Sequence, residues 1–178
     1  MLNKKKELDM DRLDMLMDKY DSPEGLVNLI VDHDRLTAKE FWQVFRYVYE
    51  DLDNVHFLTE LSAARRVIDS KYNLASASME KDEQKELFRM QHESTKCTIY
   101  RGTLGKYNIG YSWTLNKGRA TWFATRFARV YNKTPMLHEV QVPTKTIKAY
   151  WGLREQEIFI PPSILLKNKQ DILLTKCG

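Results

Sequence analysis

Cysteine, clustered histidine and long apolar runs are all scarce in this chain of 178 residues. Its two cysteines, Cys97 and Cys177, have no C-x-x-C or other paired spacing, which favours a reducing, intracellular setting over a disulfide framework. The four histidines are scattered, so no metal site is expected. No apolar run approaches the ~20 residues of a membrane-spanning helix, and acidic residues follow the basic N-terminus where a secretion signal would be apolar. We therefore expect a soluble, cytoplasmic protein without a membrane partner.

Acidic residues are scarce in the second half of the chain. Residues 95–178 hold 14 Lys and Arg but only 4 Asp and Glu, whereas residues 1–94 hold 14 and 20. The overall charge of +4 thus conceals a second half of +10 and a first half of −6. The basic half is suited to a negative partner, such as the pyrophosphate of a dinucleotide, a nucleic acid or an acidic protein.

Residues 1–94 have the apolar periodicity of helices. Ser22-Pro23 is typical of a helix start, and Thr37 to Glu40 has the capping-box pattern ahead of an aromatic stripe that includes Phe41 and Phe45. The expected role of these aromatic residues is core packing.

From Cys97 onward the periodicity changes to that of short strands. They are predicted at 97–101, 111–115, 137–142, 146–151, 156–160 and 171–175. A helix over about 117–131 interrupts them, with its inward face predicted to consist of Ala120, Phe123, Ala124 and Phe127. The sequence therefore predicts an α+β protein, with a helical region 1–94 packed on a core formed by residues 95–178.

Two glutamates open the fifth predicted strand. Side chains alternate along a strand, so Glu155 and Glu157 are expected on one face while Ile158 and Ile160 anchor the other face in the core. Two like charges held side by side are costly, which indicates a functional pair. The alternative is a solvated edge on which the glutamates pair with Arg154 or Lys148.

Common phosphate-binding and nucleophile motifs are missing. The chain has no G-x-G-x-x-G, and Gly110 to Thr114 lacks the second glycine of a nucleophile elbow. What remains is an ordered set of three short motifs, namely Tyr100-Arg101-Gly102, Ser112-Trp113-Thr114 and Glu155-Gln156-Glu157.

In the order of these motifs, and in the apolar continuation after the glutamates, the chain resembles mono-ADP-ribosyltransferases of the arginine–serine–glutamate type. The resemblance covers residues from Cys97 to the C-terminus, and phage-encoded members have a similar helix after the serine motif. It implies a small split β-sheet core, NAD as a substrate with release of nicotinamide, and no metal. It also implies a phage or bacterial effector that acts on host or defence machinery, in the host cytosol if phage-encoded.

The chemistry of NAD suggests a role for each motif. Loss of nicotinamide leaves an oxocarbenium-like ribose, which the carboxylate of Glu157 would stabilise. Ser112 would orient Glu157 or the ribose, and Glu155 would accept a proton from the incoming nucleophile. Arg101, followed by Gly102, is suited to the paired oxygens of the pyrophosphate, although an ordinary surface arginine is the alternative.

By the same resemblance, the NAD contacts would be completed by Trp113, Thr114 and Phe123. Tyr150, Trp151 and Arg154 occupy the position of an acceptor-recognition loop, in which exposed aromatic rings would stack on the target.

The expected acceptor is a protein side chain, and the resemblance implies arginine, because Glu155 stands two residues before Glu157 as in the members of the family that modify arginine. The excess of basic residues favours a protein in or near a nucleic-acid-binding machine. The alternatives are an NAD glycohydrolase, direct modification of nucleic acid, and a non-enzymatic module that binds nucleic acid or protein.

Overall fold

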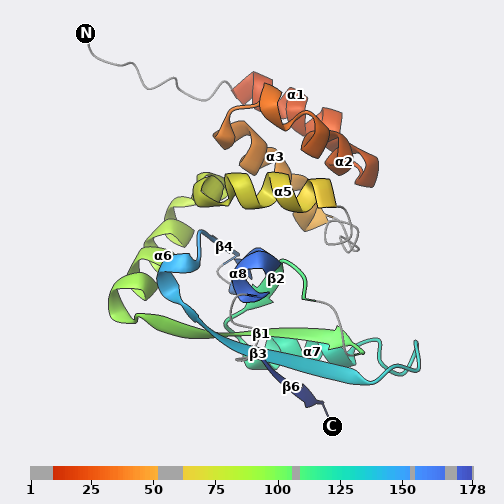
Figure 1. Cartoon of the computed structure of the whole chain (residues 1–178). Coiled ribbons are helices and arrows are strands. Elements are labelled where there is room, and N and C mark those ends of the chain that lie inside the picture. The colour runs from red at the N-terminus through yellow and green to blue at the C-terminus, as the bar shows by residue number, and fades with distance from the viewer. Residues whose placement is uncertain (1–9, 52–61, 106–108, 153–154, 167–171, 178) are drawn as a thin grey trace. The chain divides into compact units, whose positions relative to one another are not determined.

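The computed structural model describes residues 10–51, 62–105, 109–152, 155–166 and 172–177. These residues form seven α-helices and six strands, which confirms the α+β class (Figure 1). The chain divides into two compact units, residues 1–67 and 68–178. The division falls within helix α5 (Ser62–Lys71) and not at the composition shift near residue 95, so the helices between 72 and 94 belong to the same unit as the sheet. No helix of the described ranges is long and apolar enough to cross a membrane.

The first unit contains helices α1 (Met10–Tyr20), α2 (Pro23–Val31) and α3 (Ala38–Asp51) and a 3-10 turn η1 (His33–Arg35). The predicted helix starts are confirmed. Ser22 Oγ accepts a hydrogen bond from Gly25 N at 2.8 Å. Thr37 and Glu40 form a reciprocal capping box, with N–H to side-chain distances of 2.8 and 3.2 Å. The aromatic stripe of α3 is buried, as predicted, and Phe41 stacks on Phe45 at 5.8 Å between ring centroids.

The second unit begins its sheet only after two further helical segments, η2 (Tyr72–Ser78) and α6 (Lys81–Glu93). All six predicted strands form, several of them shorter than predicted: β1 (Lys96–Leu104), β2 (Ser112–Thr114), β3 (Pro135–Pro143), β4 (Ala149–Trp151), β5 (Glu157–Phe159) and β6 (Leu173–Lys176). The remaining elements are α7 (Lys117–Thr125), η3 (Thr144–Thr146) and α8 (Pro162–Leu166).

The six strands form one antiparallel sheet in the order β4-β5-β2-β1-β3-β6. β1 and β3 pair along their whole lengths, from Lys96 opposite Pro143 to Leu104 opposite Pro135. In contrast, β1 and β2 pair at a single position, where Tyr100 lies opposite Thr114. The sheet therefore consists of two three-stranded halves that are joined at a narrow point.

The helical segments η2 and α6 are tied to the β4–β5 half by buried polar contacts. The hydroxyl of Tyr72 donates to Phe159 O at 2.9 Å and accepts from Lys148 N at 3.1 Å, and burial raises the pKa of this phenol well above its usual value. Trp151 Nε1 donates to Ser78 Oγ at 3.0 Å. These bonds satisfy groups that burial would otherwise penalise, so they fix the positions of β4 and β5, which flank the turn with Glu155.

Helix α7 packs closely against β1. A Cβ atom at Gly102 would lie 1.9 Å from Ala120 O, so only glycine fits at this crossing. The face of α7 toward the sheet consists of the small residues Ala120 and Ala124, both buried. The predicted inward positions of Phe123 and Phe127 are wrong, since these side chains are 39% and 44% exposed. The short distance between helix and strand leaves no room for a ring, and α7 ends at Thr125 instead of near residue 131.

Candidate active site

The strand order brings the three sequence motifs together. β1, β2 and β5 carry the arginine, serine and glutamate motifs, and they are neighbours in the sheet. The register sets Tyr100 opposite Thr114, and Thr114 opposite Glu157. Cross-strand partners share one face of a sheet, so these three residues form a row across the narrow joint. Residues that are more than 40 positions apart in sequence are thereby adjacent.

Glu157 is the first residue of β5 and its side chain is half-buried. Glu155 precedes the strand in a turn, and Gln156 between them has a left-handed backbone with φ of 51°. We expected the two glutamates to share a face because both would belong to one strand. This is wrong, since the strand begins at Glu157 and Glu155 lies before it. The turn is closed by hydrogen bonds from Gln156 N to Gly152 O at 2.8 Å and from Leu115 N to Gln156 O at 3.1 Å.

Glu155 is held by α7 and by β2. Its carboxylate forms a close ion pair with the guanidinium of Arg119, and its backbone carbonyl accepts from Thr114 Oγ1 at 2.9 Å. Arg119 is positioned by the start of α7, where Asn116 Oδ1 caps the helix by accepting from Arg119 N at 3.0 Å. The partners that the sequence suggested for the glutamates on a solvated edge were Arg154 or Lys148, and not Arg119. The spacing of Arg119 from the Asn116 cap was the available signal that it lies in the first turn of the helix.

Thr114, and not Ser112, is the hydroxyl residue directly opposite Glu157. Thr114 is buried, and its Oγ1 also accepts from Asn116 N at 3.0 Å. Ser112 lies opposite Phe159, one pleat away on the same face. The position beside Glu157 that was expected for Ser112 is therefore occupied by Thr114.

Arg101 braces the loop that leads into β2. Its Nη1 donates to the backbone carbonyl of Ser112 at 2.5 Å, next to the single paired position of β1 and β2. A Cβ atom at Gly110 would lie 2.5 Å from Arg101 Nη2, so any side chain there would displace the guanidinium. Trp113, which is buried, secures the same loop by donating from Nε1 to Gly110 O at 3.0 Å.

Strand alternation places Arg101 on the opposite face of β1 from Tyr100, and therefore from the row that contains Glu157. On this second face Arg101 lies opposite His138 in the β1–β3 ladder. Burial, and secondarily the charge of Arg101, lower the pKa of His138 to about 4. His138 is buried and its Nε2 lies 2.9 Å from Thr103 Oγ1, so the neutral imidazole has a hydrogen-bond partner in the core.

Two of the three residues expected to recognise the acceptor, Tyr150 and Trp151, do not lie in an exposed loop. Tyr150 and Trp151 belong to β4 and are buried, so the predicted exposure of these rings is wrong. They pair with Ile158 and Glu157 of β5, and Trp151 packs on Phe159 at 4.9 Å between centroids. β4 is an edge strand that is in contact with α6 and η2, and Trp151 donates to Ser78 of η2, so its side chains are covered although the strand is at the edge. Arg154 lies outside the described residues.

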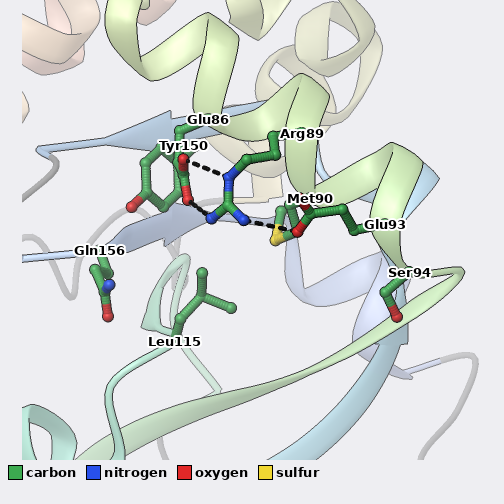
Figure 2. Close-up of a pocket in the computed structure, with 8 residues that line it drawn as sticks. All are labelled: Glu86, Arg89, Met90, Glu93, Ser94, Leu115, Tyr150 and Gln156. Atoms are coloured by element: carbon green, nitrogen blue, oxygen red, sulfur yellow. Dashed lines mark hydrogen bonds and ion pairs between the residues drawn. The ribbon is translucent and has the colours of Figure 1, made fainter.

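A small pocket lies beside the turn that carries the glutamates. Its volume is about 210 Å³ and its lining residues are Glu86, Arg89, Met90, Glu93, Ser94, Leu115, Tyr150 and Gln156. Figure 2 shows Arg89 bound between Glu86 and Glu93 on α6, facing Gln156 and Leu115 across the pocket. The pocket is smaller than the 300–1,000 Å³ that is typical of small-molecule sites, so it cannot enclose a whole dinucleotide.

Of the predicted site residues, the structure brings together Thr114, Glu155 and Glu157, and it adds Arg119 and Tyr100. Phe123 lies on the exposed side of α7, where Arg119 is 5.2 Å from its ring centroid. Within the described ranges, no group of three or more His, Cys, Asp or Glu side chains is placed to hold a metal ion. Comparisons with protein-family models, curated proteins and solved structures give no match to this chain.

Proposed function

We propose that the second unit is the core of an NAD-dependent mono-ADP-ribosyltransferase. The observation that carries the proposal is the adjacency of β1, β2 and β5, which sets a hydroxyl residue, Thr114, directly opposite Glu157. The narrow joint between β1 and β2 also supports the split sheet that the family resemblance implies.

The proposed reaction breaks the bond between the nicotinamide nitrogen and the ribose C1′, and the electron pair leaves with the neutral nicotinamide. The carboxylate of Glu157 stabilises the positive charge that develops on the ribose. The acceptor nucleophile then bonds to C1′ and loses its proton to Glu155. The ion pair with Arg119 and the bond from Thr114 to the Glu155 carbonyl would hold this second carboxylate near the first.

Arg101 is proposed to contact the pyrophosphate of NAD. Its guanidinium donates to the carbonyl of Ser112, and strand carbonyls lie in the plane of the sheet. The guanidinium therefore reaches that plane at the joint between the two halves. A guanidinium carries five N–H donors, so one group can brace a loop and bind phosphate oxygens. Of the other predicted NAD contacts, Ser112 and Thr114 lie on the face of Glu157. Gly102 packs against the backbone of α7 and Trp113 is buried, so these two would support the site without touching NAD.

The acceptor is proposed to be a protein side chain, with arginine favoured, in or near a nucleic-acid-binding machine of a host cell. The support is the charge of the chain, since residues 68–178 hold 18 Lys and Arg against 10 Asp and Glu. NAD itself carries only two phosphate charges. Because Tyr150 and Trp151 are buried, the acceptor would be recognised by other residues.

Incubation with NAD labelled in the adenylate part tests the proposal, first with the protein alone and then with cell extract. Label on macromolecules is the expected result, and mass spectrometry of the labelled material identifies the modified residue. Free ADP-ribose without labelled macromolecules would indicate an NAD glycohydrolase. Unchanged NAD in both incubations would contradict an enzymatic function and favour a binding module.

A further inference from the structure

Helix α7 and the turn after it carry an exposed group of rings and arginines, which we call the α7 surface. It consists of Trp122, Phe123, Phe127, Tyr131, Arg119 and Arg126. We propose that the α7 surface binds single-stranded nucleic acid. This binding does not depend on the proposed transferase reaction and is expected without NAD.

The rings are held in place and remain open to solvent. Trp122 and Tyr131 are 48% and 60% exposed. Trp122 packs edge-on against Phe123 with 5.1 Å between ring centroids, and Phe127 packs edge-on against Tyr131 at 6.1 Å. Large aromatic residues in such number on one short segment are unusual for a surface without a partner.

The arginines lie over the rings. The guanidinium carbon of Arg126 is 4.7 to 5.1 Å from the centroids of Trp122, Phe123 and Phe127. Arg119 is 4.9 Å from the Trp122 centroid and also pairs with Glu155. The α7 surface is therefore continuous with the turn that carries the candidate catalytic glutamates.

The charge of this segment has one sign. Residues 117–133 contain five Lys and Arg and no Asp or Glu. Two of the five, Lys117 and Arg119, form ion pairs with Glu139 and Glu155. Arg126, Arg129 and Lys133 extend beyond these pairs along the segment, and Arg129 and Lys133 are exposed. A long polyanion fits such a segment better than a single anion does.

Rings and guanidinium planes on one surface are the groups on which unpaired bases stack, while basic side chains meet the phosphates. A membrane-surface helix has a different pattern, because its apolar and cationic side chains occupy opposite faces. On α7 the arginines lie over the same rings that would have to insert into a bilayer. Base stacking uses this combination, whereas insertion into lipid would require the arginines to leave the rings.

Intrinsic fluorescence gives a local probe of the α7 surface. The chain has four tryptophans, and Trp42, Trp113 and Trp151 are buried whereas Trp122 is exposed. We expect an unstructured oligouridylate of about 15 nucleotides to quench the tryptophan fluorescence of the full-length protein. It should also protect Trp122 from quenching by acrylamide. Trp122→Phe should remove most of this signal.

Variants then test whether the rings and the guanidinium contribute to binding, with fluorescence anisotropy of a labelled oligouridylate as the measurement. Phe127→Ala should raise the dissociation constant about fivefold or more, since stacking on one base is worth about 1–3 kcal/mol. Arg126→Lys keeps the charge but loses the planar group, so it should weaken binding while the dependence on salt stays the same. Phe88→Ala, which removes an exposed ring on α6, and Lys145→Gln, which removes a charge on η3, are the matched controls and should bind as the wild type does.

Three results would overturn the proposal. The first is equal binding of the single strand by wild type and Phe127→Ala, and the second is no protection of Trp122 at saturating oligouridylate. The third is a duplex of the same length binding as tightly as the single strand, because base stacking would then contribute nothing.

Discussion

At the scale of single residues, Glu155 and Glu157 are close in sequence but belong to different local structures. Glu157 begins a strand, and Glu155 lies in a turn where Arg119 and Thr114 hold it. The two carboxylates can therefore have separate roles. Glu155→Ala should abolish transfer to the macromolecule while slow hydrolysis of NAD persists, since only the acceptor would lack its base. Assays of labelled macromolecule and free ADP-ribose in parallel measure both, and an equal loss in the two assays would assign Glu155 to NAD binding or to structure.

His138 is the residue from which a pH dependence of stability is expected. Its pKa is lowered to about 4 in the folded protein, against about 6.5 in an unfolded chain. The unfolded state therefore binds more protons between these values, so this contribution to stability is present above pH 6.5 and is lost as the pH falls toward 4. Between pH 7 and 4.5, the wild type should lose about 2 kcal/mol of unfolding free energy more than His138→Gln.

Denaturant unfolding of both proteins at the two pH values isolates this contribution, because titrating carboxylates affect wild type and variant alike. If the unfolding free energies of wild type and His138→Gln fell by the same amount, His138 would bind a proton as readily in the folded as in the unfolded protein. This would contradict a lowered pKa.

At the scale of elements, the docking of α7 on β1 depends on one glycine. Gly102→Ala would bring a methyl group into the backbone of α7 at Ala120, so α7 must move away from the sheet. We expect a loss of about 2 kcal/mol or more in unfolding free energy and a weaker ion pair between Arg119 and Glu155. Gly118→Ala is a milder comparison within the same helix, since its new Cβ would meet a side-chain oxygen, Asn116 Oδ1 at 3.3 Å, and no backbone atom outside the helix. It should cost much less than Gly102→Ala, because a side-chain oxygen can shift by a few tenths of an ångström and alanine favours helix. A wild-type melting temperature for Gly102→Ala would contradict the packing described.

Strand β4 gives a second test at this scale, through two tryptophans in contrasting positions. Trp151 is buried and bonded to Ser78, whereas Trp122 is exposed on α7. Trp151→Ala should cost about 3–5 kcal/mol, and hydrolysis and transfer should fall together. Trp122→Ala should remain within about 0.5 kcal/mol of the wild type. Thermal melts compare the two, and a stable Trp151→Ala that lost only transfer would restore Trp151 to acceptor recognition.

The sequence was sufficient to predict elements whose signals are local. The six strands, the Ser22 helix start and the capping box of Thr37 and Glu40 depend on alternation or on side chains three residues apart. The burial of Tyr150 and Trp151 could not be read in this way, because it depends on η2, which joins β4 from more than 70 positions earlier in the chain. The exposure of Phe123 has a similar origin, since Gly102 on another element decides which side of α7 can approach the sheet.

At the scale of the whole molecule, composition located the basic region but not the division of the chain. The charge changes sign near residue 95, whereas the compact units divide after Val67. The acidic helix α6 contacts β4 and therefore belongs with the basic sheet. Charge reflects partners and solubility, whereas the division into units reflects packing, so the two boundaries need not coincide.

The residue opposite Glu157 on the neighbouring strand could also not be predicted from the sequence. Ser112 and Thr114 are both hydroxyl residues of one short strand, and only the register decides that Thr114 lies opposite Glu157. The order of the three motifs in the chain was visible, but their adjacency depends on the strand order of the folded sheet.

The rate of nicotinamide release from NAD, compared between wild type and Glu157→Gln, tests the central claim most directly. The substitution keeps the size of the side chain and removes the charge that would stabilise the ribose in the transition state. We expect release by the wild type and a rate lower by a factor of about 10²–10³ in the variant, with little change in NAD affinity. Release at the same rate by both proteins would contradict the assignment of Glu157 as the catalytic carboxylate and, with it, the proposed function.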